Sequence, residues 1–211
     1  MAGQIHDIVA RIGDELEAKN AARDKALLDT RQLIRQAALA IRALHRGDAT
    51  EAERLLQSGS NMVDEIRRDL ERYPDLYWSG YVQDAQKEYV EASVVAALIG
   101  AVDVPTPSEL RVELGAYLNG LGEAASEMRR YILDIIRHGQ EERHQDGERA
   151  LALMDDIYTA LITVDFPDAL TGGLRRTTDL VRGVLERTRG DLTMSLRQAQ
   201  LERALNRTDT H

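Results

Sequence analysis

One helical pattern runs without a break from about Ile5 to Arg46. Its apolar side chains return every three or four residues, which places them along one face of an α-helix. They are Ile5, Ile8, Val9, Ile12 and Leu16, then Leu27, Ile34, Ala38, Ile41 and Leu44. Composition favours the same structure, because only 4 Pro, 7 Tyr and 1 Phe stand against many Ala, Leu, Glu and Arg, which are better helix formers than strand formers. We therefore expect an all-α fold.

Helix-breaking residues divide the rest of the chain. The segment "HRGDAT" ends the first helix, and a second helix extends to about Arg72. Pro74 separates it from a third helix, which runs to about Ala101. A fifth helix is expected over about residues 148–164, and after "DFPDALTGG" the chain forms one helix, or two divided near Gly190.

The start of the fourth helix carries the sharpest local signal. In "VDVPTPSEL", Thr106 suits the N-cap, Pro107 suits the first helical position, and Glu109 completes a capping box. We expect this helix to run to about Arg137. The chain has no internal repeat, low-complexity segment or linker rich in Gly, Ser or Pro, so residues 1–211 are expected to form a single domain.

Composition also limits the classes of function. The absence of cysteine excludes disulfides, thiolate metal sites and cysteine nucleophiles, and it fits a reducing compartment. The N-terminus lacks the pattern of a secretory signal, and the longest apolar run, "ASVVAALIGAV", is too short to span a membrane. We therefore expect a cytoplasmic protein without a membrane partner. A net charge of −9 argues against a surface coated for nucleic-acid binding, although it leaves room for a local basic lining.

Two pairs of glutamates interrupt otherwise apolar or small residues. Glu88 and Glu91 lie in the apolar stripe of the third helix, and Glu123 and Glu127 lie beside small residues on the fourth. Their spacings place both members of each pair on one side of a helix. If the two helices pack together, four carboxylates converge. Oxygen ligands of this kind suit Mg²⁺ or Mn²⁺, and such ions can activate water for phosphodiester cleavage.

Other interpretations compete with a metal site. Charged pairs at these spacings usually lie on a solvated surface. A carboxylate-bridged di-iron centre needs Glu-x-x-His motifs, and neither Glu91 nor Glu127 is followed by histidine at that distance. The basic residues that could contact phosphate also suit surface ion pairs; they are Arg31, Arg35, Arg42, Arg46, Arg129 and Arg130.

Four stretches resemble the translin and translin-associated factor X (TRAX) superfamily, and the chain looks like an archaeal-type member of it. They are "RQLIRQAALAIRALHRG", "QKEYVEASVV", "LGAYLNGLGEAASEMRRYILDII" and "MDDIYTALITVDFPDALTGGLRRTTDLVRGVLERTRGDL", which span most of residues 30–192 in the family's order. The segment "EYVEA" is the most specific. The resemblance implies a translin-like bundle of about seven helices and a hollow homo-oligomer, an octamer in this family. It also implies binding of single-stranded RNA or DNA on the inner surface.

The resemblance further implies a chemistry. TRAX-type subunits are Mg²⁺-dependent endoribonucleases, and the catalytic glutamates of their "EYVE" segment fall on Glu88 and Glu91. A second catalytic acid pair falls on Glu123 and Glu127. We therefore expect these four residues to hold Mg²⁺ or Mn²⁺ in an endoribonuclease that cleaves single-stranded RNA inside the shell.

One position departs from the TRAX pattern. TRAX typically has Asp where this chain has Glu123, which is closer to the "ELASE" segment of translin. Translin-type subunits generally bind nucleic acid without cleaving it. The alternative is therefore a non-catalytic, translin-like protein that binds single-stranded RNA or DNA.

Overall fold

The computed structural model describes residues 2–138 and 143–208, and it confirms the all-α prediction, since these residues contain no strand. The long helices in this part are α1 (Ala2–His45), α2 (Ala49–Asp69), α4 (Gly80–Gly100), α6 (Leu114–Arg137), α7 (His144–Leu161) and α9 (Leu174–Thr208). One-turn helices in the connections are α3 (Pro74–Tyr77), α5 (Pro107–Leu110) and α8 (Asp168–Thr171). None of the helices described is long and apolar enough to cross a membrane.

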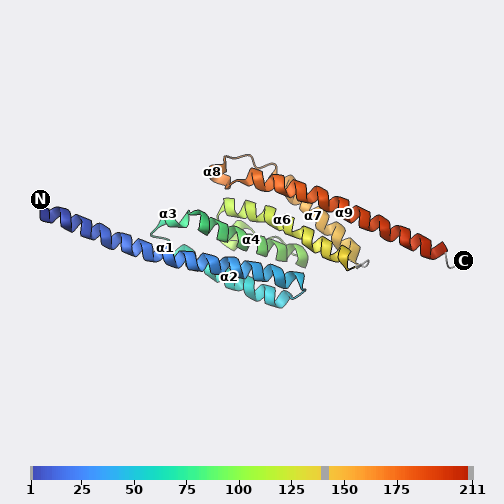
Figure 1. Cartoon of the computed structure of the whole chain (residues 1–211), viewed down its shortest axis with the longest axis horizontal. Coiled ribbons are helices and arrows are strands. Elements are labelled where there is room, and N and C mark those ends of the chain that lie inside the picture. Colours follow the sequence, from blue (N-terminus) through green and yellow to red (C-terminus); the bar gives the residue numbers. More distant parts are fainter. Residues whose placement is uncertain (1, 139–142, 209–211) are drawn as a thin grey trace.

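The long helices pack as three successive pairs (Figure 1). The first pair, α1 and α2, forms an antiparallel hairpin that packs against α4. The central pair is α4 and α6, and α6 in turn packs against α7 and α9. The two helices that carry the predicted acids are therefore neighbours at the centre of the molecule.

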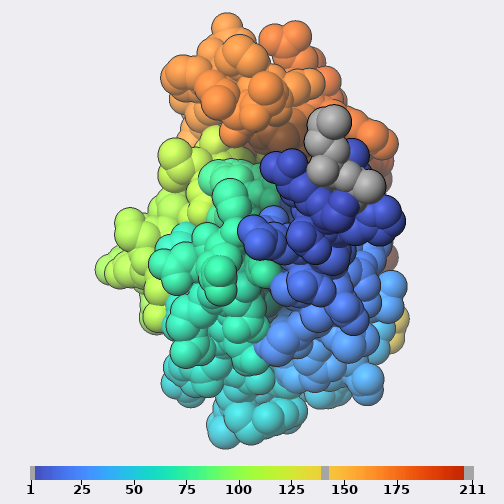
Figure 2. Space-filling model, turned by 90° about the vertical axis from the view of Figure 1, so that its left-hand side faces the viewer, coloured from blue at the N-terminus to red at the C-terminus, as the bar shows by residue number. Residues whose placement is uncertain are grey.

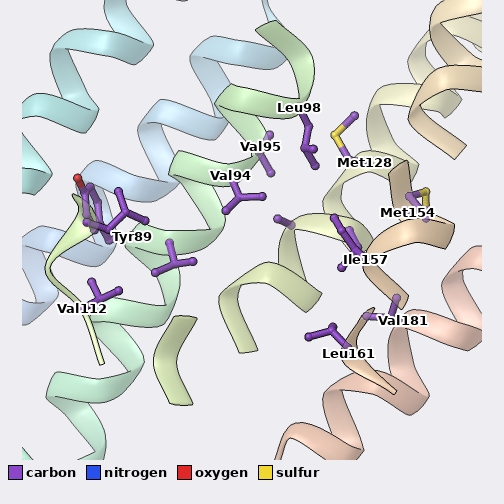
Figure 3. Close-up of a cluster of buried hydrophobic side chains, with 14 of the residues drawn as sticks. Tyr89, Val94, Val95, Leu98, Val112, Met128, Met154, Ile157, Leu161 and Val181 are labelled. Carbon is purple, nitrogen blue, oxygen red and sulfur yellow. The ribbon is translucent and has the colours of Figure 1, made fainter. Parts of the chain in front are cut away.

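The apolar core joins these layers. Val94 and Leu98 of α4 lie opposite Met128 of α6, with Met154 and Ile157 of α7 beyond (Figure 3). All five side chains are buried. Because α4 is packed against α1, α2 and α6, little of its surface reaches solvent, and polar groups on it must lie at the borders between helices.

Gly120 allows α6 to approach α4 closely. A Cβ atom at this position would lie 2.6 Å from the carbonyl oxygen of Lys87 and 2.7 Å from Cβ of Val90. Contacts this short cannot be made, so only glycine fits here. The close approach brings α6 against the turn of α4 that precedes Glu91, which is how the two acid pairs come to share one border.

The prediction of one continuous fourth helix is wrong, although its predicted start is right. The capping box is confirmed, because the backbone N–H of Glu109 donates to Thr106 Oγ1 and the backbone N–H of Thr106 donates to Glu109 Oε2. The helix stops after one turn, however, where Arg111 adopts a left-handed φ of 57°. It restarts as α6, whose N-cap residue Glu113 donates its backbone N–H to the buried side chain of Gln86 at 2.9 Å.

The last helix is continuous, since α9 passes through Gly190 without a break. Both α1 and α9 extend beyond the body, at opposite ends of the long axis (Figure 1). In the end-on view, the first turns of α1 stand in front of the body (Figure 2). Their apolar residues are between 49% and 62% exposed: Ile5, Ile8, Val9, Ile12 and Leu16. The apolar stripe of α1 therefore continues past its partners in the described chain.

Candidate metal centre

Three of the four predicted acids meet where α4 borders α6. Carboxylate oxygens of Glu88 and Glu91 on α4 and of Glu123 on α6 all lie within 4.8 Å of one another. Each of the three residues is half-buried. The packing of α4 on α6 thus produces the convergence that the helical spacing predicts.

The fourth acid, Glu127, is turned toward α1. Its Oε1 lies 2.7 Å from Nε2 of His45 and 3.8 Å from Nη1 of Arg130. The His45 side chain is only 4% exposed, and its Nδ1 lies 3.9 Å from Oδ2 of Asp134. Within the described residues, Nδ1 has no hydrogen-bond partner. His45 therefore fixes the carboxylate of Glu127 at the edge of the acid cluster.

Lys87 places one positive charge in the cluster. Its Nζ lies 2.7 Å from Oε1 of Glu123 and 3.4 Å from Oε1 of Glu88. Desolvation is the largest single influence on the pKa of Lys87 and lowers it, but the hydrogen bonds and charges of Glu123 and Glu88 outweigh desolvation and raise the pKa overall. Burial raises the pKa of Glu123 above its ordinary value, even against the opposing effect of Lys87.

Glu91 lacks a partner of this kind. Within residues 2–138 and 143–208, no hydrogen bond or ion pair holds its carboxylate. Burial first, and then the negative charges of Glu88, Glu123 and Glu127, raise the pKa of Glu91 to about 8, an effect that Lys87 offsets only in part. Glu91 therefore carries a proton at neutral pH. Strongly shifted carboxyl groups of this type concentrate at functional sites.

The ligands at this border suit a hard divalent cation. Three carboxylates from two helices offer oxygen atoms only, which Mg²⁺ and Mn²⁺ prefer. A second acid triad in the described chain, Asp29, Glu65 and Asp69, differs because Lys25 bonds all three carboxylates. In the cluster of Glu88, Glu91 and Glu123, one ligand is left without a cation. We take this cluster as the candidate metal centre.

Four of the predicted phosphate contacts form one stripe at the C-terminal end of α1. Arg31, Arg35 and Arg42 lie on one face of α1, and Arg46 lies in the turn that directly follows the helix. All four are exposed. In the described part of the chain, none of them has an ion pair within 4.0 Å. The stripe is therefore available for an anionic partner.

The two predicted arginines of α6 lie in different surroundings. Arg130 is exposed on the same face as Glu127. Arg129 faces α9 instead, where its Nη2 lies 2.8 Å from Oδ2 of Asp191 and its Nη1 donates to Oγ1 of Thr188 at 3.2 Å. Arg129 therefore joins α6 to α9 and does not lie among the acids.

Sequence reasoning missed His45 and Lys87. Their partners lie 82 and 36 positions away in the chain, so only the packing of helices brings them together. Lys87 carried a weak signal, since it is one of three lysines among 27 basic residues and directly precedes a predicted ligand. No local pattern marks His45.

The fold and this site can be compared with known proteins. The crystal structure of AfC3PO, a translin/TRAX-family protein, is 31% identical in sequence and matches with a TM-score of 0.82 over 92% of this chain and 98% of AfC3PO. The chain belongs to the translin/TRAX superfamily. A structure of AfC3PO in a complex with duplex RNA matches at 30% identity and a TM-score of 0.81, with the same coverage.

Two further matches are more distant in sequence. NeC3PO, at 19% identity, matches with a TM-score of 0.78 over 89% of this chain and 96% of its own, which supports the fold alone. An uncharacterized protein of Methanocaldococcus jannaschii is 28% identical over 194 residues, which are 91% of this chain and 84% of that protein. No family model matches the chain. The predicted resemblance to the translin/TRAX superfamily is confirmed at the level of the family.

Proposed function

We propose that this protein binds RNA and cleaves it with a divalent metal ion held by Glu88, Glu91 and Glu123. The convergence of these three carboxylates carries the proposal. It is strengthened by Glu91, which is half-buried among acids and has no ion pair within the described residues. A purely structural cluster would be expected to pair each of its acids, because a carboxyl group withdrawn from water without a partner costs stability.

Each residue of the site has a role in this proposal. Glu88, Glu91 and Glu123 would hold Mg²⁺ or Mn²⁺, and Glu127 would complete the acid set from the position where His45 holds it. A divalent cation at such a site supplies an activated water and stabilises charge on the leaving oxygen. Glu91 must lose its proton before it can act as a ligand.

RNA binding rests on a relative and on the basic stripe of α1. AfC3PO has been observed in a complex with duplex RNA. In this chain the exposed arginines Arg31, Arg35 and Arg42 lie on the helix that also supplies His45 to the acid site, and Arg46 follows directly after that helix. Because the chain is acidic overall, phosphate contacts must come from a local surface such as this one. Arg130 would add a contact beside Glu127.

We further propose that the protein works as a hollow homo-oligomer, an octamer as the family resemblance implies. The exposed apolar stripe at the start of α1 supports assembly, because contiguous apolar surface of this kind is usually covered by a partner. Enclosure would place the active sites and the basic stripe around an inner space.

RNA cleavage by the purified protein tests the proposed function. End-labelled single-stranded and duplex RNA would be incubated with Mg²⁺ or with EDTA. We expect products only with Mg²⁺, and none from the Glu88→Ala/Glu91→Ala variant. An Asp29→Ala/Glu65→Ala variant, which removes two acids from the Lys25 triad, serves as the matched control and should cleave normally.

The same experiment decides the alternative, a translin-like protein that binds nucleic acid without hydrolysis. Glu123 favours this alternative, since it replaces the Asp of the TRAX pattern and is held by Lys87. RNA that shifts on a gel but stays intact with Mg²⁺ would replace the nuclease proposal with this one. A choice between single-stranded and duplex RNA follows from the same two substrates.

A further inference from the structure

Lysine is rare in this chain, and each lysine lies against carboxylates. Only Lys19, Lys25 and Lys87 occur among 27 basic residues. Lys19 pairs with one aspartate at 2.6 Å, Lys25 contacts three acids, and Lys87 contacts two. An ammonium group is a compact point charge with three donors, whereas the guanidinium of arginine is a planar fork. Lysine thus stands where a small cation fits between acids.

Lys87 holds two of the three residues of the candidate metal centre. Its Nζ is 2.7 Å from Glu123 and 3.4 Å from Glu88, whereas Glu91 has no ion pair in the described chain. The two acids that Lys87 holds come from different helices. The ammonium therefore compensates charge across the α4–α6 border, in the manner of a bridging cation.

The Lys87 side chain is able to leave this position. It is 22% exposed, so one side of it reaches solvent, and its four-carbon stem has several rotatable bonds. Within the described residues, its ammonium forms no hydrogen bond except to acids. Movement of Lys87 would require no change in the backbone of α4.

We propose that the ammonium of Lys87 and a divalent cation are alternative occupants of the Glu88–Glu123 pair. The inference rests on the proposed metal site and names its regulator. Repulsion between a divalent ion and an ammonium on the same two carboxylates disfavours simultaneous occupancy. Lys87 compensates the acids while the site holds no metal, and it lowers the affinity of the site because the metal must displace it.

Chemical labelling of the wild-type protein tests the displacement. Lysine acetylation rates would be measured by mass spectrometry on the full chain, with Mn²⁺ or with EDTA. Mn²⁺ is expected to raise the rate at Lys87 about fivefold or more and to leave Lys19 and Lys25 unchanged. An unchanged or slower rate at Lys87, or an equal rise at Lys25, overturns the inference. This measurement does not depend on the folding of any variant.

Mn²⁺ affinity tests the competition. By calorimetry, Lys87→Met should bind Mn²⁺ about tenfold more tightly than the wild type, and the added change Glu91→Gln should remove the gain. Arg137→Met removes one positive charge from α6, the helix that carries Glu123, without touching the acid cluster, so it should alter the affinity less than twofold. Equal affinities for Lys87→Met and wild type overturn the inference.

Mn²⁺ binding and RNA cleavage distinguish failure of the Lys87 inference from failure of the proposed function. If the wild type binds Mn²⁺ and cleaves RNA while Lys87 gains no reactivity and does not limit affinity, the Lys87 inference fails and the proposed function stands. If neither the wild type nor Lys87→Met binds Mn²⁺, both fail.

Discussion

Binding of a divalent cation should release a proton from Glu91. Burial and the neighbouring acids raise the pKa of Glu91 to about 8, and a carboxyl group must be ionised to bind a metal. At pH 7 such a group is about nine-tenths protonated, so about 0.9 proton leaves per cation bound. The value should approach about 1 at pH 6 and fall to about 0.5 at pH 8. Lys87 contributes no proton, because its pKa is raised above an already basic value.

The same pKa fixes how affinity depends on pH. Above pH 8 the Glu91 carboxylate is already ionised, and the metal binds without a proton penalty. Below pH 8 the folded protein without metal holds a proton that the complex does not, so affinity falls by up to about tenfold for each unit of pH. Metal binding should therefore strengthen as pH rises toward 8.

Calorimetry with Mn²⁺ in two buffers of different ionisation enthalpy measures the proton count at each pH. Glu91→Gln is the control, since an amide has no proton to lose in this range and its proton count should be near zero. A wild-type count near zero at pH 7 would refute the reasoning, because Glu91 would then be ionised before the metal arrives.

Three further predictions address packing, assembly and RNA binding. Gly120→Ala should lower the free energy of unfolding in urea by about 2–3 kcal/mol, because the added Cβ would overlap the α4 backbone. The control Gly190→Ala has open space around the added Cβ and should stabilise α9 by about 0.5–1 kcal/mol. Equal effects of the two changes would contradict the close approach of α6 to α4. Ile8→Asp should reduce the oligomer to smaller species in light scattering. The chain itself should stay folded, since the Ile8 side chain is already 50% exposed. An unchanged mass would exclude the apolar stripe of α1 from assembly. Arg42→Ala should reduce the slope of log binding constant for RNA against log salt concentration by about 0.7–0.9. Replacing Arg54, which pairs with a glutamate at 2.7 Å on α2, should leave this slope unchanged. Equal slopes for both variants would exclude the α1 stripe from the RNA interface.

The helices could be predicted because their signals are local. Apolar spacing sets α1, and the capping box sets the start of α5 where Thr106 and Glu109 predict it. The break at Arg111 could not be predicted, because it depends on the side chain of Gln86 from a different helix. Glycine was an ambiguous signal, since α9 tolerates Gly190 within its length.

The acids of the candidate site could be predicted from local spacing, but their partners could not. The spacing of Glu88 and Glu91 places them on one side of α4, and the helical register of α6 places Glu123 opposite. The partners of these acids depend on tertiary contacts, so the local sequence could not predict the hydrogen bond between His45 and Glu127. For the same reason it could not predict that α6 packs on α9 and that Arg129 pairs with Asp191 there. Catalysis by these acids stays a prediction.

Anomalous diffraction from crystals grown with Mn²⁺ would locate the metal ion directly. We predict a manganese peak coordinated by carboxylate oxygens of Glu88, Glu91 and Glu123, with the ammonium of Lys87 turned away from Glu123. Absence of manganese at these carboxylates, with Lys87 still bonded to Glu123, would contradict the proposed metal centre and leave the acid cluster a structural feature.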